Sequence, residues 1–346
     1  MKNSSNHAHR AMGGERVGAR VIPLGRPDMT RRDRDAVEWR MKCAPFGDAA
    51  LVERWERMWS SSWGREAVLF DDPLDVAMAL KQVFRWGDGA RIAAGGGMHP
   101  AFREGFAAAW LRVVHHDLQP DQPHRFAGGG DFVAAWVEHF QGLPVSISGG
   151  PGMVVEDVTS TPLPLPGVGE KMIQVMVLDG NAMLQGGNAA LLLCRDPALA
   201  VQFRALRHPP SGLVVALGMS QLSQWELFLG RRTQLAERYL RLRSGGWFTV
   251  PGRAVEKRWW HRFHLTFAEE GRRDGLRDFL GRGGIMTDSA WPFSFPEVAN
   301  MACRKDYECR TLALPLYASL TDGEQKRIIN RVHRWVERGG PRSLSA

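Results

Sequence analysis

The chain is poor in cysteine, and its few cysteines are not spaced as a metal or disulfide motif. Cys43, Cys194, Cys303 and Cys309 include no CxxC pair, and no histidines stand around them at zinc-site spacing. Cys194 ends the apolar run AALLLC, which is typical of a buried core thiol. We therefore expect a reducing, cytoplasmic setting and no zinc site.

Long hydrophobic runs are also missing. No apolar stretch approaches the roughly 20 residues that a membrane-spanning helix needs. Residues 1–20 are polar and lack the apolar core of a signal peptide, so we expect a disordered tail there. His115 and His116 are neighbours in an expected strand and point to opposite faces, which does not favour a shared metal ion. The sequence thus predicts neither a membrane protein nor a metalloprotein.

Lysine is scarce, since only Lys2, Lys42, Lys81, Lys171, Lys257, Lys305 and Lys326 occur among 45 basic residues. The net charge of +8 therefore comes from arginines scattered along the chain. Their densest group, residues 26–40, is interleaved with four acidic residues, as on a mixed-charge helix face. We expect no nucleic-acid partner.

Apolar strand patterns, in contrast, are abundant and alternate with helical ones over the first 200 residues. Strands are expected at residues 66–70, 90–94, 112–117, 145–148, 153–157, 173–178 and 189–194. Helices are expected at residues 29–41, 49–59, 73–84, 101–110 and 131–140. This order favours an α/β sheet covered by helices on both faces.

The last third of the chain reads as a second, smaller α/β unit. A long helix is expected over 222–243, a strand over 259–267, and a closing helix over 322–335 with Thr321 as its cap. The predicted domains are a tail at 1–20, a large α/β domain at 21–221, and a linking helix with a small C-terminal domain at 222–346.

Several segments in a fixed order resemble the DegT/DnrJ/StrS sugar aminotransferases. They include VERWERMWSSSWG, VLFDDPLDVAMAL, VVED, MIQVMVLDGNAMLQGGNAALLLCRD and, as the most specific match, LPLYASLTDGE. The resemblance covers about residues 21–336. It implies a type I pyridoxal phosphate (PLP) transferase fold, with a mostly parallel mixed sheet between helices and a smaller C-terminal domain. The stretch from Asp117 to Asp157 is shorter than the family expects, which implies a missing helix.

The resemblance also implies a lysine that carries PLP as a Schiff base, and that lysine is absent. Counting back from AALLLCRD places Ala182 at its position. Lys171 is nearest in sequence but stands at the opposite end of the preceding strand. A methyl group neither tethers the cofactor nor moves a proton, so we expect no bound PLP.

The family's phosphate-binding residues are replaced as well. Asp71, Asp72 and Pro73 stand where the family has Ser-Gly-Thr, and Val177 replaces a supporting serine. Asp72 and Pro73 suit a helix N-cap and first position, so the helix end is satisfied by its own carboxylate. Two carboxylates facing a phosphate repel it.

One cofactor residue is kept. Asp157 matches the acid that pairs with the pyridine nitrogen in the family, while the ring-contacting glutamine becomes Ser160. Asp157 also fits a purely structural interpretation, in which it caps a turn or pairs with an arginine.

These substitutions leave three functional hypotheses. The first is a catalytically degenerate homologue, or pseudoenzyme, that acts as a regulatory or scaffolding partner in sugar or polysaccharide biosynthesis. The second is a binding module that holds a nucleotide sugar or another small ligand in the vacated cleft. The third is an active aminotransferase with a displaced lysine.

The resemblance finally implies a dimer, because the family builds its active sites from two subunits. We expect a homodimer or a heterodimer with an active paralogue. Thirteen tryptophans, a residue enriched where partners meet, fit this expectation. Apolar residues considered for the contact are Trp39, Phe46, Trp55, Trp59 and Trp63.

Overall fold

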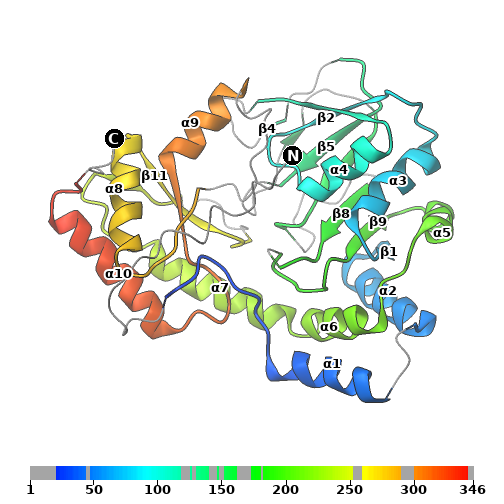
Figure 1. Cartoon of the computed structure of the whole chain (residues 1–346), viewed down its shortest axis with the longest axis horizontal. Coiled ribbons are helices and arrows are strands. Elements are labelled where there is room, and N and C mark those ends of the chain that lie inside the picture. The colour runs from blue at the N-terminus through cyan, green and yellow to red at the C-terminus, as the bar shows by residue number, and fades with distance from the viewer. Residues whose placement is uncertain are drawn as a thin grey trace, which may run out of the picture.

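The computed structural model has two lobes joined by a long helix (Figure 1). It describes residues 21–43, 47–117, 125–126, 130–139, 146–147, 152–161, 173–180, 182–251, 259–289 and 300–341. The tail at 1–20 lies outside these ranges, as do Phe46, Lys171 and Lys257.

The larger lobe is built on a seven-stranded sheet in the order β1-β9-β8-β7-β5-β2-β3. Its strands are β1 (Glu66–Phe70), β2 (Arg91–Ala94), β3 (Arg112–His115), β5 (Ala134–Glu138), β7 (Val154–Asp157), β8 (Ile173–Val177) and β9 (Ala190–Cys194). The five strands from β8 to β3 are parallel, and β9 runs antiparallel to both its neighbours. A short separate pair is formed by β4 (Arg125–Phe126) and β6 (Ser146–Ile147).

Helices cover both faces of this sheet. They are α2 (Ala49–Trp63), α3 (Pro73–Phe84), α4 (Pro100–Ala108), α5 (Pro197–Leu206) and α6 (Gly212–Leu222), and α1 (Arg31–Cys43) packs outside them on α6. In β9, Leu192 packs in the core beneath α3, α4 and α5, while Leu191 and Leu193 pack in the core beneath α2 and α6. Each strand thus places alternate side chains in two separate cores, as a sheet between two helical layers requires.

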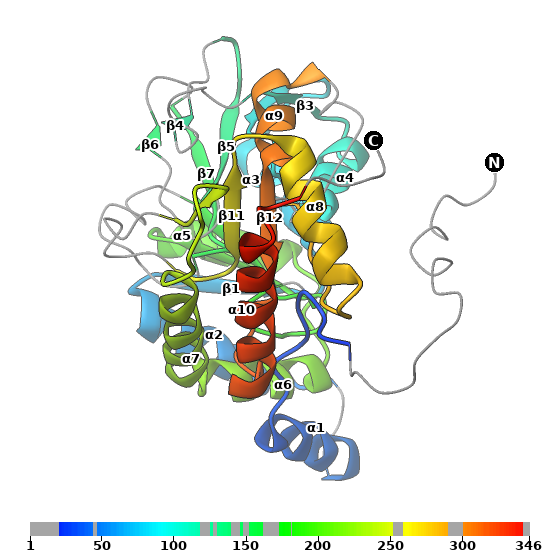
Figure 2. The same ribbon diagram turned by 90° about the vertical axis from the view of Figure 1, so that its left-hand side faces the viewer.

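The smaller lobe packs helices on a three-stranded sheet. It contains β10 (Phe248–Thr249), β11 (Phe263–Phe267), β12 (Thr311–Leu314), α8 (Glu270–Gly281), α9 (Ala302–Arg310) and α10 (Asp322–Glu337). Figure 2 shows α8 and α10 in front of this sheet. The lobes are joined by α7 (Trp225–Tyr239), whose Trp225 belongs to the large-lobe core and whose Tyr239 belongs to the small-lobe core.

Two of the predicted helices, at residues 29–41 and 322–335, begin with caps that the structure shows. At α1, the Thr30 hydroxyl accepts a hydrogen bond from the Asp33 backbone N–H, and the Asp33 carboxylate accepts one from the Thr30 N–H. The same reciprocal capping box links Thr321 and Glu324 at α10. Each box satisfies N–H groups that the helix itself leaves without a partner.

The pair Trp55-Glu56 on α2 lies entirely inside the large lobe. The Glu56 carboxylate accepts from the Leu69 N–H at 2.9 Å and forms ion pairs with Arg204 and Arg207. Trp55 lies over Gly218 of α6, where an added Cβ would stand 1.9 Å from the indole ring. Glycine at this position therefore lets α6 approach α2 closely.

The helix predicted for residues 131–140 is wrong. Residues 134–138 form the inner strand β5, in which Ala134 and Trp136 face one core and Ala135 and Val137 face another. Parallel strands buried on both faces are continuous apolar runs, and periodicity alone does not separate such a run from a short buried helix. The described residues between Asp117 and Val154 contain strands but no helix.

The long helix predicted for residues 222–243 is found as α7, which is shorter at both ends, and a separate helix, α6, precedes it after a break. The Ser223 hydroxyl donates to the Ser220 carbonyl, and the Gln224 side chain donates to the same carbonyl and to Asp33 of α1. These side-chain bonds compete with the helical pattern and end α6.

Candidate functional site

The turn between β8 and β9 carries the position expected for the lysine. Ala182 lies there with 6% of its surface exposed. Its N–H donates to the Asp179 carboxylate at 2.9 Å, and its carbonyl accepts from the Gln185 side chain at 2.9 Å. Hydrogen bonds thus fix the backbone of Ala182 at both its N–H and its carbonyl. The Ala182 side chain is a methyl group, which cannot act as an acid, a base or a nucleophile.

No lysine among the described residues takes over this position. The Lys81 amine donates to the Ala109 carbonyl and pairs with Asp88 beside α3, and Lys42 pairs with Glu38 on α1. Lys305 and Lys326 are exposed on α9 and α10. Lys2, Lys171 and Lys257 are outside the described ranges.

The N-terminus of α3 is closed by its own side chains. Asp72 is the N-cap, and its Oδ1 accepts from the Leu74 N–H at 2.8 Å. Its Oδ2 accepts from the Asn188 amide at 3.1 Å. The Asp75 carboxylate, in the first turn of α3, lies 2.9 Å from the His208 imidazole. The Asp71 N–H donates to the His208 carbonyl.

The end of β7 is tied to β8 through one hydroxyl. Thr159 donates to Asp157 Oδ1 at 2.5 Å, and the Thr159 N–H donates to the same oxygen at 3.0 Å. The Thr159 hydroxyl in turn accepts from the Val177 N–H at 3.0 Å. Asp157 therefore caps the turn after β7, while the Val177 side chain is buried in the hydrophobic core and offers no hydroxyl.

Further acids lie at the same edge of the sheet, where the parallel strands end. Glu138 ends β5 directly opposite Asp157, and Asp179 follows β8 and accepts from His99 Nε2 at 3.2 Å. Because His99 Nδ1 accepts from the Ala101 N–H, the imidazole proton sits on Nε2. We call Glu138, Asp157, Asp179 and His99 the acidic edge.

Burial sets the charge of this edge. It raises the pKa of Glu138 to about 8, with the nearby Asp157 adding to the rise while the Gly97 N–H and Arg304 oppose it. Glu138 Oε1 accepts from the Gly97 N–H at 2.6 Å, and Oε2 is buried without a hydrogen-bond partner among the described residues. Burial also raises the pKa of Asp157 against its bonds from Thr159. Glu138 is therefore protonated at neutral pH.

Glu138, His99 and Asp179 were not among the sequence-predicted site residues. The helix predicted over 131–140 hid Glu138, since an acid in a helix does not mark the end of a strand. The signal that was available is the glycine run before His99: a Cβ at Gly95 would lie 2.6 Å from Glu138 Oε1. Glycine is needed here because a carboxyl group closes onto the loop.

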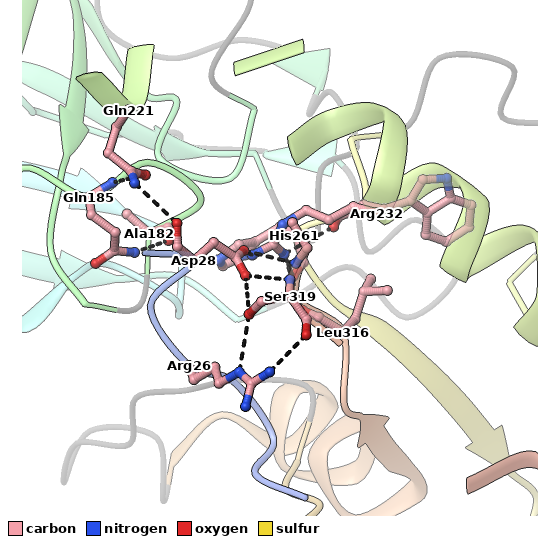
Figure 3. A network of polar contacts seen from close by, with 11 residues as sticks. Arg26, Asp28, Ala182, Gln185, Gln221, Arg232, His261, Leu316 and Ser319 are labelled. Atoms are coloured by element: carbon pink, nitrogen blue, oxygen red, sulfur yellow. Dashed lines mark hydrogen bonds and ion pairs between the residues drawn. The ribbon is translucent and has the colours of Figure 1, made fainter. Parts of the chain in front are cut away.

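A second polar network joins the lobes (Figure 3). Asp28 accepts from the Ala318 N–H at 2.8 Å, from the Ser319 N–H at 2.7 Å, and from Arg232 at 3.2 Å. Arg232 also donates to the carbonyls of His261 and Leu316. We call Asp28, Arg232 and the main-chain groups that they bind the lobe bridge.

The lobe bridge reaches the Ala182 turn through glutamines. Gln221 of α6 donates to the Asp28 carbonyl at 3.1 Å, and its own oxygen accepts from the Gln185 N–H at 3.3 Å. Gln185 then holds the Ala182 carbonyl. The position of Ala182 is thus fixed relative to both lobes (Figure 3).

Ser160 and Asp117 make two further links between the lobes. The Ser160 hydroxyl lies 3.1 Å from His261 Nδ1. Asp117, after β3, accepts from the Cys303 and Arg304 N–H groups at the start of α9. Ser160 therefore contacts the small lobe through its side chain.

Between the lobes lies a pocket of about 310 Å³ that the Ala182 turn helps to form. Its walls are the N-terminal segment Pro23–Pro27, the turn residues Gly180 and Ala182, and small-lobe residues. The polar lining residues are Arg26, Arg232, His261, Arg262 and Asp288. Asp71, Asp72, Asp157, Ser160 and Val177 do not line it. Of the site residues predicted from the sequence, Ala182 lines this pocket and the five others do not.

The part of the chain that the structure describes holds no group of three or more His, Cys, Asp or Glu side chains arranged for a metal ion. None of its helices combines the length and the apolar character that a membrane span requires.

Comparisons with known proteins agree with the fold. The aminotransferase TlmJ from Streptoalloteichus hindustanus superposes with a TM-score of 0.77 at 18% identity, over 92% of this chain and 99% of that one. PseC from Helicobacter pylori, an aminotransferase of pseudoaminic acid biosynthesis, gives 0.78 at 13% identity over 92% and 100%. The sugar aminotransferase CalS13 from Micromonospora echinospora gives 0.74 at 16% identity over 90% and 99%.

Sequence comparison gives a narrower match. No curated protein matches the chain. Residues 211–333 match the model of the DegT/DnrJ/EryC1/StrS aminotransferase family. This segment runs from α6 to α10 and includes the LPLYASLTDGE segment of the small lobe. The resemblance predicted from the sequence is confirmed: residues 211–333 carry the pattern of the DegT/DnrJ/EryC1/StrS family, and the chain folds as a sugar aminotransferase does.

Proposed function

We propose that this chain is a catalytically degenerate homologue of PLP-dependent sugar aminotransferases. It would act as a regulatory or scaffolding partner in sugar or polysaccharide biosynthesis. The observation that carries the proposal is Ala182, a methyl side chain on an ordered turn where the family resemblance requires the lysine. When bound, PLP supplies an electron sink for transamination, but it needs an amine for its tether.

The surroundings support the same conclusion. A phosphate at the start of α3 would meet the Asp72 carboxylate, which already accepts from the Leu74 N–H. Two charges about 4 Å apart repel by roughly 4 kcal/mol at an effective dielectric constant of about 20. Val177 adds no donor, and Asp157 is engaged by Thr159. These residues do not fit PLP, so we derive no reaction step through it.

The test is a spectrum of the purified chain with added PLP. We expect no visible imine band and no lysine label after borohydride reduction. A labelled lysine would overturn the proposal and favour an active aminotransferase with a displaced lysine. Peptide mapping would then identify it, with Lys171 and Lys257 as the first peptides to inspect.

A rescue series sharpens this test. Ala182→Lys alone should show no transaminase activity, because the carboxylates at α3 remain. Activity is expected only when Asp71, Asp72 and Pro73 are also replaced by Ser, Gly and Thr, and Val177 by Ser. Activity of the Ala182→Lys variant alone would contradict this interpretation of the phosphate site. It would mean that the chain lacks only the lysine that holds PLP.

A partner role requires a surface for the partner. Trp55, Trp59 and Trp63 are buried in the large-lobe core and therefore do not contribute to a partner-binding surface. Trp39 of α1 is 60% exposed, and its neighbour Met41 is 61% exposed. We propose that α1 contributes to a homodimer or to a heterodimer with an active paralogue. Light scattering at micromolar concentration should detect the dimer, and Trp39→Glu should weaken its association. A chain that stays monomeric and does not bind the active paralogue would contradict the proposal.

A second candidate function is a ligand-binding module. The specific observation in its favour is the pocket of about 310 Å³ against Ala182. Pockets of this kind with a few polar groups are the usual sites for small molecules.

A further inference from the structure

One arginine of this pocket has no hydrogen-bond or ion-pair partner among the residues that the structure describes. Arg262 lies just before β11 and lines the pocket. Its guanidinium forms no hydrogen bond or ion pair with any described residue, and its Nε is buried. Arg262 as a whole is half-buried, and a partly desolvated cation gains from an anionic partner, because removing a charge from water is costly.

The other two arginines of the lining do have partners for their guanidinium groups, although Nε of Arg232, like Nε of Arg262, is buried without a hydrogen bond among the described residues. Arg232 donates to three carbonyls and pairs with Asp28. Arg26 donates to the Ser319 hydroxyl and carbonyl and lies over the Tyr317 ring. Both stabilise the junction of the lobes. Arg262 has no such task among the described residues.

The nearest acid does not neutralise Arg262. Asp288 lines the same pocket, but its carboxylate is exposed, accepts from the Ser289 N–H, and forms no ion pair with Arg262. Burial lowers the pKa of the Arg262 guanidinium, an effect that Asp288 opposes and Arg232 reinforces. Three arginines against one aspartate make the lining positive.

We propose that this pocket binds a small organic oxyanion, a carboxylate or a phosphate monoester, with Arg262 as its charged partner. A guanidinium presents a planar fork of donors that matches both kinds of anion, so one side chain serves either. His261 and Arg26 face the same space and add positive charge and polar groups to it.

The size of the pocket limits the body of the ligand. About 310 Å³ lies at the lower end of the roughly 300–1,000 Å³ that ligand pockets occupy. Leu314, Leu316 and Tyr317 form an apolar wall, and Met286, 54% exposed, stands at the rim. The pocket therefore suits a ligand of about monosaccharide size rather than a complete nucleotide sugar.

This inference does not rest on the proposed loss of PLP. Arg262 and the pocket would have the same chemistry if a displaced lysine carried the cofactor. Borohydride labelling without added anions tests the cofactor, and anion binding to protein prepared without PLP tests the pocket. Either result can fail while the other holds.

The experiment is calorimetric titration with two defined anions, succinate and glucose 1-phosphate, at constant ionic strength. We expect saturable binding of at least one, and its identity distinguishes the carboxylate from the phosphate source. Glucose, the uncharged control, should not bind. Arg262→Gln should weaken binding by about tenfold or more, because a hydrogen-bonded charge is lost.

Matched variants keep the test interpretable. Arg241→Gln removes the same charge from an exposed position just after α7 that does not line the pocket, and it should bind like the wild type. Arg262→Lys keeps the charge without the fork, so it should fold even if Arg262→Gln does not, and it should bind more weakly than the wild type. The inference fails if neither anion saturates, or if the Arg241 and Arg262 variants lose affinity equally.

Discussion

The lobe bridge and the acidic edge both bury ionisable groups, but the bridge pairs its carboxylate with a cation, whereas Glu138 at the edge faces a second acid. Asp28 receives two main-chain N–H groups, a hydroxyl and Arg232. At the edge, Glu138 stands opposite Asp157, and one of its oxygens lies buried without a partner among the described residues. The first arrangement stabilises ionised groups, and the second favours protonation.

This contrast separates two kinds of constraint on the chain. The bridge connects the N-terminal segment, α7 and the loop after β12, so its groups are needed for the two lobes to meet. The acidic edge lies where ligands of open α/β sheets bind, at the carboxyl ends of the strands. The Asp28 carboxylate at the junction of the lobes is paired with a cation and with N–H donors, while Glu138 and Asp157 at the strand ends lie opposite one another.

The largest expected effect is on the bridge. Asp28→Ala leaves Arg232 buried without its carboxylate, which should lower the free energy of unfolding by about 3–5 kcal/mol. Urea denaturation at neutral pH measures it. Asp35→Ala is the control, since Asp35 pairs with Arg31 on the exposed face of α1 and should cost at most about 1 kcal/mol. Equal effects would mean that the bridge is no more important than a surface ion pair.

The next effect is on the acidic edge and depends on pH. The pKa of Glu138 is about 8 in the folded chain, against an ordinary value of 4.5. Between these values the unfolded chain releases a proton that the folded chain keeps, so this group makes stability fall as pH rises from about 4.5 to 8. Glu138→Gln should remove that slope and raise the free energy of unfolding at pH 8 by about 1–3 kcal/mol.

Urea denaturation at pH 5 and pH 8 checks this expectation. The variant and the wild type should be nearly equal at pH 5, because glutamine resembles the protonated acid and keeps the acceptor for the Gly97 N–H. Glu104→Gln on the exposed face of α4 is the matched control and should keep the wild-type slope. If the free energy of unfolding changed with pH equally in the wild type and in Glu138→Gln, Glu138 would be ionised at neutral pH and the expectation would be wrong.

The smallest effect concerns the start of α3. Asp72→Ala removes the N-cap and should cost about 0.5–2 kcal/mol, whereas Asp72→Ser keeps a cap and should cost less. Thermal unfolding of both variants distinguishes them. If the alanine and serine variants unfolded at the same temperature, the N-cap hydrogen bond of Asp72 would not contribute to stability.

Much of the fold followed from the sequence because its signals are local. Asp72-Pro73 and Thr321 fix helix starts through short-range hydrogen bonds, and the apolar run of β9 is visible without any knowledge of its neighbours. The assignment of Ala182 to the lysine position, which rests on counting along a segment of recognisable order, stays a prediction.

The acidic edge and the pocket could not be predicted in this way. Glu138 lies opposite Asp157 only because β5 and β7 pair in register, and Arg262 lines the same pocket as Ala182 only because the two lobes lie together. The break before Trp225 depends on the contact of Gln224 with Asp33, 191 residues away in sequence. Such features arise from tertiary contacts that leave no periodic trace.

The lobe bridge also has a kinetic consequence. Because Asp28, Arg232 and Ser319 hold the lobes together within the chain itself, closing the pocket requires no ligand. A molecule that enters it meets walls already in place, so little affinity is lost to rearrangement. The rate at which a ligand enters and leaves the pocket would then depend on local movement at the rim around Met286. Substitutions at this rim would change the residence time of the ligand more than substitutions in the lobe bridge.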